Sequence, residues 1–219
     1  MINWSYGITT VPQRSETLLP RTIVSLEKAK FGLPQLFTDF RPLGVYGNWA
    51  LCAWQLYLRN PFADVYVIFQ DDIVVNRNLK LYLEHLKYPV DGYFNLMTWP
   101  ENEELAKGEV GWFRSNQKGR SACGLLFPND KLRLLLQQKK FVEKARDRSK
   151  PGKCVDGVIL EAMRCLGLKE YCHYPSLLAH TGDDLSSTNN RNSPQTTSFR
   201  GEDFDSLAFL EEIDKSLLI

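Results

Sequence analysis

The sequence has no apolar run long enough to cross a membrane, since no segment approaches the roughly 18 to 20 residues that span a bilayer. Its first residues lack the basic stretch and apolar run of a secretory signal. It also lacks a charge excess: 27 lysines and arginines face 26 acids, a formal net charge of +1 that gives no overall attraction to nucleic acid or anionic lipid. We therefore expect a cytoplasmic protein that recognises its partners through local chemistry.

Paired cysteines and internal repeats are missing too. The five cysteines are an odd number without a Cys-x-x-Cys pair, which argues against a disulfide framework and a cysteine-built zinc site. No period repeats along the chain, which argues against a solenoid. The remaining composition, 43% hydrophobic and 24% charged over 219 residues, is typical of an ordinary globular protein. We expect one domain with a substantial core.

Strand-like and helix-like segments alternate along the chain. The pattern predicts helices around residues 18–26, 49–58, 78–86, 131–146, 155–166 and 206–218. It predicts strands over residues 4–9, 65–69, 92–97 and 171–180, with turn residues at Gly47 and Asn48 and a long loop over 99–119. Parallel-type strands alternating with helices indicate an α/β sandwich, in which ligands bind beyond the carboxyl ends of the strands.

The most informative segment is VYVIFQDDIVV. Residues 65–69 form a continuous apolar run, typical of a strand buried on both faces, and Asp71 and Asp72 follow it closely. Burying an ionised carboxylate without a partner is prohibitively costly, so the pair needs a cation. Hard oxygen ligands suit Mg²⁺ or Mn²⁺ bridging to nucleotide phosphates. The alternative is that one acid caps the next helix and the other faces solvent.

Two residues further along carry possible chemistry. His180 ends the last apolar strand before a Thr-Gly turn, where its imidazole is placed either to bind a metal or to serve as an ordinary strand-end histidine. Asp156 opens a predicted helix, and a carboxylate at that position is a sound helix cap that can also accept a proton.

These segments, taken in order, resemble the GT-A-type nucleotide-sugar glycosyltransferases. IFQDDIVV resembles their Asp-any-Asp or Glu-Asp-Asp metal motif, and ITTVPQR resembles their first strand and nucleotide loop. SACGLLFP resembles the small-residue stretch below the sugar and acceptor, CVDGVI the motif with the catalytic acid of inverting members, and LLAHTG the late metal-site histidine. The resemblance covers roughly residues 4–182. It implies a Rossmann-like three-layer α/β/α catalytic domain over 1–182 with a mostly parallel sheet, and a polar loop and C-terminal helix over 183–219 packed on it.

The resemblance also implies a metal-dependent hexosyl- or pentosyltransferase. Mn²⁺ or Mg²⁺ would be held by Asp72, His180 and Asp71, and Asp156 would remove the acceptor proton in an inverting reaction. The donor, foremost a UDP-sugar, would contact Thr9, Thr10, Arg14, Asp39, Gln70 and Asp71. The acceptor, a saccharide or small molecule, would contact Trp99, Trp112 and Gly124. Gln70 departs from the pattern, because many relatives have an acid there.

Three other interpretations stay open. The basic stretch from Lys139 to Lys153 suits the same chemistry on a hydroxymethylated base in DNA, although a solvated helix face and exit loop explains it as well. A non-catalytic nucleotide-sugar-binding module would follow if Gln70 marks a decayed metal site. A nucleotidyltransferase shares the layout and the paired acids, but it usually has a glycine-rich phosphate loop near the first strand, which ITTVPQR lacks.

Overall fold

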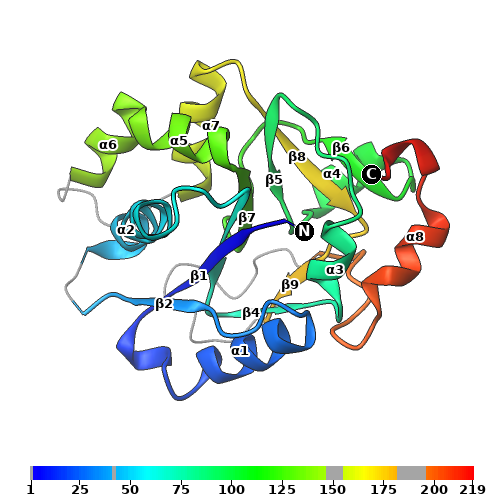
Figure 1. Ribbon diagram of the computed structural model, residues 1–219, viewed down its shortest axis with the longest axis horizontal. Coiled ribbons are helices and arrows are strands. Elements are labelled where there is room, and N and C mark those ends of the chain that lie inside the picture. The colour runs from blue at the N-terminus through cyan, green and yellow to red at the C-terminus, as the bar shows by residue number, and fades with distance from the viewer. Residues whose placement is uncertain (1, 41–42, 147–154, 182–195) are drawn as a thin grey trace.

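A computed structural model of the chain describes residues 2–40, 43–146, 155–181 and 196–219. Its centre is a seven-stranded sheet in the order β2-β1-β3-β7-β5-β8-β6 (Figure 1). The strands of this sheet are β1 (Trp4–Thr10), β2 (Gln35–Thr38), β3 (Val65–Gln70), β5 (Gly92–Asn95), β6 (Gly111–Arg114), β7 (Gly124–Pro128) and β8 (Lys169–Tyr174). A second sheet has two antiparallel strands, β4 (Ile73–Val75) and β9 (Leu178–His180).

The large sheet is mostly parallel. β1 pairs in parallel with β2 and β3, and β5 pairs in parallel with β8. β7 runs antiparallel to both β3 and β5, and β6 runs antiparallel to β8. β2, β1, β3, β5 and β8 therefore share one direction, which confirms the predicted sheet. The carboxyl ends of β1 and β3 meet at one edge, where a ligand site is expected.

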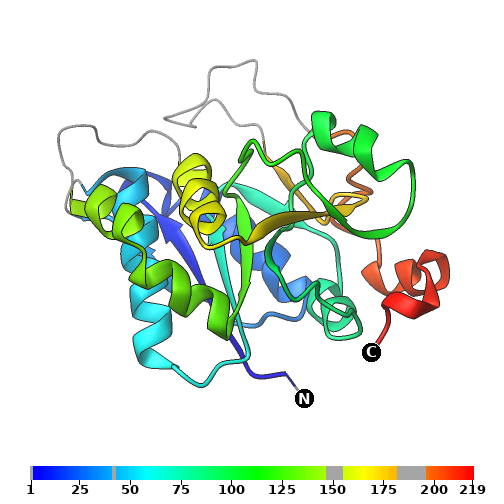
Figure 2. The ribbon, with the colours of Figure 1, turned by 90° about the horizontal axis from the view of Figure 1, so that it is seen from above.

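Helices cover both faces of the sheet. One face carries α1 (Leu18–Lys28), α3 (Leu79–Leu83) and α8 (Phe209–Glu212), and the other carries α2 (Gly44–Arg59), α5 (Asn129–Gln137), α6 (Lys139–Arg146) and α7 (Val155–Cys165) (Figure 1). Figure 2 shows α8, in orange-red, at the opposite end of the molecule from α2. The shorter elements are α4 (Pro100–Glu103) and the 3₁₀ turns η1 (Pro12–Arg14), η2 (Glu104–Ala106), η3 (Ser206–Ala208) and η4 (Lys215–Leu217).

Two apolar clusters hold the three layers together. β3 supplies both of them, because Val67 and Phe69 point into the cluster beneath α1 and α3, while Tyr66 and Ile68 point into the cluster beneath α2 and α5. All four side chains are fully buried, as the continuous apolar run predicts. Phe209 of α8 belongs to the first cluster, so the C-terminal segment packs on the same sheet.

The start of α2 differs from the prediction. Gly47 and Asn48 lie inside the helix rather than in a turn before it. Asn48 is buried, and its side-chain amide donates to the carbonyl oxygens of Thr10 (3.1 Å) and Phe37 (2.9 Å). These contacts tie the helix to the ends of β1 and β2, so tertiary hydrogen bonds outweigh the turn preference of asparagine.

Several other expected elements are divided, shortened or interrupted. The helix predicted over 131–146 is two helices, because Gln138 adopts an extended ψ of 127°. The strand predicted over 171–180 is split into β8 and β9 around a cis Tyr174–Pro175 bond. The helix predicted over 78–86 shortens to α3, and that predicted over 206–218 becomes η3, α8 and η4. The loop predicted over 99–119 contains α4, η2 and β6.

Two simple expectations can be checked on the described residues. No helix there is both long and apolar enough to cross a bilayer. Cys52, Cys123, Cys165 and Cys172 are free thiols, and Cys154 lies outside the described residues.

Candidate active site

The acid pair lies at the carboxyl end of β3, beside the end of β1. Asp71 and Asp72 are buried, with 2% and 3% of their surfaces exposed. Asp71 Oδ2 accepts a hydrogen bond from Thr10 Oγ1 at 2.6 Å, and Asp71 Oδ1 accepts one from Arg14 Nη1 at 2.7 Å. Thr10 ends β1 and Arg14 lies in η1 just beyond it, so the parallel pairing of β1 with β3 brings them together.

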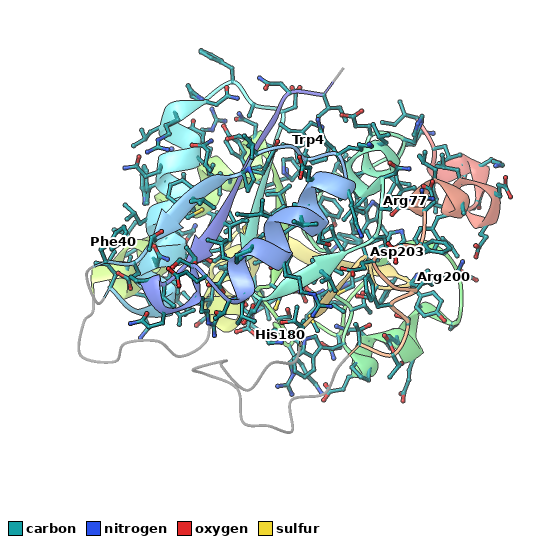
Figure 3. The ribbon with its side chains drawn as sticks, turned by 90° about the horizontal axis from the view of Figure 1, so that it is seen from below. Trp4, Phe40, Arg77, His180, Arg200 and Asp203 are labelled. Atoms are coloured by element: carbon teal, nitrogen blue, oxygen red, sulfur yellow. The ribbon has the colours of Figure 1, made fainter. Side chains whose placement is uncertain are left out.

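Asp72 connects Arg14 to His180. Its Oδ2 accepts a hydrogen bond from Arg14 Nη1 at 3.0 Å and lies 3.0 Å from His180 Nε2. His180 is held in place by the pairing of β9 with β4, and the neighbouring Thr181 N–H donates to the Asp72 carbonyl at 2.8 Å. Figure 3 shows His180 on the side of the molecule opposite Trp4, the first residue of β1. Neither acid caps a helix or faces solvent, and both have the cationic partner that burial demands.

The two carboxyl groups have different proton affinities. Burial raises the pKa of both. For Asp72, the hydrogen bond and charge of His180, together with the charge of Arg14, outweigh burial and hold the pKa below its ordinary value. For Asp71, burial outweighs the Thr10 hydrogen bond and the Arg14 charge, and the charge of Asp72 adds to it, so the pKa stays above its ordinary value. Asp72 is therefore the more readily ionised of the two acids.

Helix α1 holds the backbone of this acid turn through two hydroxyl groups that sequence reasoning missed. Thr22 Oγ1 accepts from Ile73 N at 3.1 Å and lies 2.8 Å from the carbonyl oxygens of both Asp71 and Ile73. One turn later, Ser25 Oγ accepts from Val75 N at 2.9 Å. Both hydroxyls are buried, so each replaces hydrogen bonds that the short β4 strand lacks on that side.

Asp156 is fixed at the first turn of α7. Its Oδ2 accepts a hydrogen bond from Ser121 N, and its Oδ1 accepts one from Gly157 N, both at 2.9 Å. Ser121 has a left-handed φ of 73°, which is uncommon for a residue with a side chain. Burial raises the pKa of Asp156, and these backbone hydrogen bonds only partly oppose that effect. The result is an oriented carboxylate of increased basicity.

Residues 121–123 join Asp156 to the acid pair. Gln70 N donates to the Cys123 carbonyl at 2.9 Å, and Cys123 Sγ lies 3.3 Å from Gln70 Oε1. Burial raises the pKa of the Cys123 thiol, and the negative charges of Asp72 and Asp156 raise it further. Cys123 thus lies within electrostatic reach of both acids, and three consecutive residues connect the two parts of the candidate site.

A buried acid behind Asp156 is a second feature that sequence reasoning missed. Glu170 on β8 is 1% exposed and accepts hydrogen bonds from Ser115 Oγ at 2.6 Å and Asn95 Nδ2 at 3.3 Å. Asn95 Nδ2 also donates to the Ser121 carbonyl at 3.1 Å, which links Glu170 to the residue that holds Asp156. Burial raises the pKa of Glu170 to about 7. The sequence offered one signal of this buried acid, because Glu170 occupies an inward-facing position in the strand sequence KEYCHY.

The other expected donor contacts lie near the acid pair but have structural partners. Asp39 N donates to the Thr10 carbonyl, while the Asp39 carboxylate accepts from Leu43 N (3.2 Å) and Gly44 N (3.1 Å) at the start of α2. Thr9 Oγ1 donates to the Phe69 carbonyl at 3.2 Å. Their roles toward a donor remain predictions.

The expected acceptor residues are occupied by packing. The Trp112 ring lies 4.8 Å from the Phe94 ring and 5.2 Å from the His173 ring, centroid to centroid. Trp99 precedes α4 and packs against the core beneath α1 and α3. A side chain on Gly124 would come within 2.4 Å of Leu178, so close packing accounts for this glycine. The structure therefore gives each residue a packing role, and acceptor contact stays a prediction.

Two lysines of the basic stretch have acidic partners where the structure describes it. Lys139 pairs with Glu143 at 3.7 Å, and Lys140 pairs with Glu161. Residues 147–153 of this stretch lie outside the described residues. The paired lysines fit the solvated helix face of the plainer interpretation.

Asp72 and His180 are the side chains that could bind a divalent cation. Among the described residues, no three His, Cys, Asp or Glu side chains form a complete metal site. Asp72 and His180 do converge, and the buried Asp72 Oδ1 has no hydrogen-bond partner within the described ranges. One carboxylate, one imidazole and the phosphates of a bound nucleotide form a ligand set that suits Mn²⁺ or Mg²⁺. The residues fit a cation that completes its coordination with a substrate.

Comparison with known proteins bears on the fold. No family model and no curated protein matches the chain. The solved catalytic domain of Drosophila β1,4-galactosyltransferase 7, in complex with xylobiose, matches with a TM-score of 0.52 at 8% identity, over 98% of this chain and 82% of that one. The fold is that of the GT-A glycosyltransferases. A197 from STIV (TM-score 0.44, 11% identity, 80% of this chain and 85% of that one) is a further similar structure. GalNAc-T7 with UDP, GalNAc and Mn²⁺ is another similar structure, with a TM-score of 0.49 and 11% identity over 80% of this chain and 43% of that one.

Proposed function

We propose that the protein is a metal-dependent glycosyltransferase, which moves a sugar from a nucleoside-diphosphate sugar, foremost a UDP-sugar, to an acceptor hydroxyl. The observation that carries the proposal is the position of the Asp72 Oδ2 atom. It meets Arg14 from the β1 side and His180 from β9, at the edge of a GT-A sheet where the carboxyl ends of parallel strands converge. A buried carboxylate, an imidazole and a permanent cation gathered there suit a metal-bound diphosphate.

Asp72 and His180 are the residues that would hold Mn²⁺ or Mg²⁺. The metal, when bound, supplies electrostatic stabilisation of the negative charge that develops on the leaving diphosphate. Asp71 has both carboxylate oxygens engaged, by Thr10 and by Arg14. We therefore assign Asp71 to the orientation of Arg14 rather than to direct coordination.

Arg14 and Gln70 are the donor-binding residues that the geometry favours. The guanidinium of Arg14 is charged at any working pH and matches the planar arrangement of phosphate oxygens. It lies beside the acid pair with 13% of its side chain exposed, so it is close to the metal site and still reaches solvent. Gln70 contributes a neutral amide at the end of β3, directly before the acids.

Asp156 is the proposed base. Two backbone N–H groups fix its carboxylate, and burial increases its affinity for a proton. An acceptor oxygen must lose its proton as it attacks the anomeric carbon, and an oriented carboxylate can take that proton. Attack from the side opposite the leaving diphosphate gives inversion. β1,4-galactosyltransferase 7 binds the saccharide xylobiose, and we propose a saccharide hydroxyl as the acceptor here.

A thermal-shift panel tests the proposal. UDP-, GDP-, CMP- and dTDP-sugars are added with and without Mn²⁺, because a ligand that binds only the folded state raises the melting temperature. We expect at least one nucleotide sugar to raise it when Mn²⁺ is present. Asp72→Asn should abolish the shift. Asp91→Asn is the matched control, because it also removes a carboxylate from an ion pair, in this case the pair with Lys169 away from the site. If no nucleotide sugar binds with metal, the proposal is wrong.

A further inference from the structure

Arg14 places a positive charge between the two carboxylates of the acid pair. A single nitrogen, Nη1, lies 2.7 Å from Asp71 Oδ1 and 3.0 Å from Asp72 Oδ2, so it bridges the two carboxylates. The side chains of the two acids are 3% and 4% exposed. Two adjacent carboxylates with so little solvent are stable only beside positive charge. Arg14 provides that charge in the described structure, and the imidazole Nε2 of His180 lies 3.0 Å from Asp72 Oδ2.

The residues that fit a metal overlap with those that hold Arg14. Asp72 Oδ2 is the oxygen that faces His180 Nε2, and it is also the oxygen that accepts from Arg14. A cation ligated by Asp72 and His180 takes over this oxygen. A guanidinium ion and a divalent cation repel each other, and water is scarce at this site to screen them. The two cations therefore compete for one carboxylate.

The segment that carries Arg14 is short and lies at the surface. Arg14 is the last residue of η1, a 3₁₀ turn on the surface with no buried residue. The neighbouring residues Pro12, Gln13 and Ser15 are exposed. Arg14 belongs to neither apolar cluster, so a change in the position of its guanidinium does not require a change in the core. In a donor complex the diphosphate offers Arg14 an anionic partner, which a planar guanidinium binds well.

We propose that Arg14 is the resident counter-ion of the acid pair and that it exchanges with the divalent metal, which releases the guanidinium to the donor diphosphate. This proposal rests on the proposed function, since the diphosphate belongs to the nucleotide-sugar donor. Metal and nucleotide then bind cooperatively through Arg14. The metal alone binds weakly, because it must displace the arginine. The nucleotide offsets the cost of that displacement, because its diphosphate binds the released guanidinium. Such coupling is reciprocal, so each ligand strengthens the binding of the other by the same factor.

The test measures Mn²⁺ binding by isothermal titration calorimetry, with and without UDP. Arg14→Met removes the charge and keeps a similar length. We expect it to bind Mn²⁺ alone at least tenfold more tightly than the wild type, because no resident cation has to leave. The strengthening of Mn²⁺ binding by UDP should shrink at least tenfold in this variant. Arg77→Met is the matched control, because Arg77 pairs with Asp205. Figure 3 shows Arg77 away from His180.

The outcomes separate this proposal from the proposed function. Equal or weaker Mn²⁺ binding by Arg14→Met, compared with the wild type and Arg77→Met, overturns the exchange even if UDP binds. Tighter Mn²⁺ binding supports the exchange at the acid pair, and if UDP then binds no variant, the proposed function fails separately. If Arg14→Met does not fold, Arg14→Gln takes its place in the titration, because the glutamine amide can still donate a hydrogen bond to Asp71. It should show the same gain in Mn²⁺ affinity.

Discussion

Replacing Asp156 with asparagine should stop sugar transfer and leave the donor bound. An amide cannot accept the acceptor proton, and general bases contribute factors of about 10² to 10⁴ to rate. We therefore expect kcat to fall by about 10² to 10⁴, which corresponds to about 3 to 5 kcal/mol of barrier. The asparagine oxygen can replace one of the two carboxylate oxygens that accept from Ser121 N and Gly157 N. The lost hydrogen bond costs about 1.5 to 3 kcal/mol, partly offset because a neutral amide is cheaper to bury than an ion.

The assay measures initial rates at saturating donor and acceptor, together with the donor-induced thermal shift. Asp214→Asn is the matched control, because Asp214 also accepts a backbone N–H at the start of a helical turn, that of Ser216 at 2.9 Å. We expect the control to keep wild-type kcat. If Asp156→Asn retains more than a tenth of wild-type kcat, the assignment of Asp156 as base is refuted. A parallel loss of donor affinity would instead place Asp156 at the donor.

Two further predictions concern the supports of the site. Thr22→Val and Ser25→Ala each remove a buried hydroxyl that bridges α1 to β4, and each should lower the free energy of unfolding by about 1 to 3 kcal/mol. Only Thr22→Val should also weaken Mn²⁺ binding, because only Thr22 lies 2.8 Å from the Asp71 carbonyl; equal metal affinity in both variants would contradict this. Burial raises the pKa of Glu170 to about 7. Between the ordinary pKa of a glutamate and pH 7, the folded protein therefore keeps a proton on Glu170 that the unfolded chain releases. The free energy of unfolding should fall by about 3 kcal/mol as the pH rises through that range. Glu170→Gln should flatten this part of the stability–pH curve measured by urea unfolding, and an unchanged slope would show that Glu170 is ionised throughout.

Local sequence patterns predicted the features that depend on nearest neighbours. The apolar run before the acids required a strand covered on both faces, and the cost of burying two carboxylates required a cation beside them. A metal was predicted there, and that prediction stays open. The described structure adds Arg14, which lies 57 residues away from Asp71 in sequence and reaches it because β1 pairs with β3.

The elements that were missed depend on contacts between distant segments. Thr22 looks like an ordinary helical threonine until α1 packs against β4, 51 residues further on. Asn48 reads as a turn residue, because its bonds to the carbonyl groups of Thr10 and Phe37 exist only in the folded chain. Glu170 has a polar partner, Ser115, from a loop 55 residues earlier. The periodicity of hydrophobic residues within one segment contains no information about such distant partners.

The most direct test of the central claim is the release of UDP from a UDP-sugar in the presence and absence of Mn²⁺, measured for the wild type and for Asp72→Asn. The account predicts that the wild type releases UDP only with the metal, that acceptor sugar accelerates the release, and that Asp72→Asn shows neither effect. Release by the wild type that is the same with and without Mn²⁺, or undiminished release by Asp72→Asn, would contradict it.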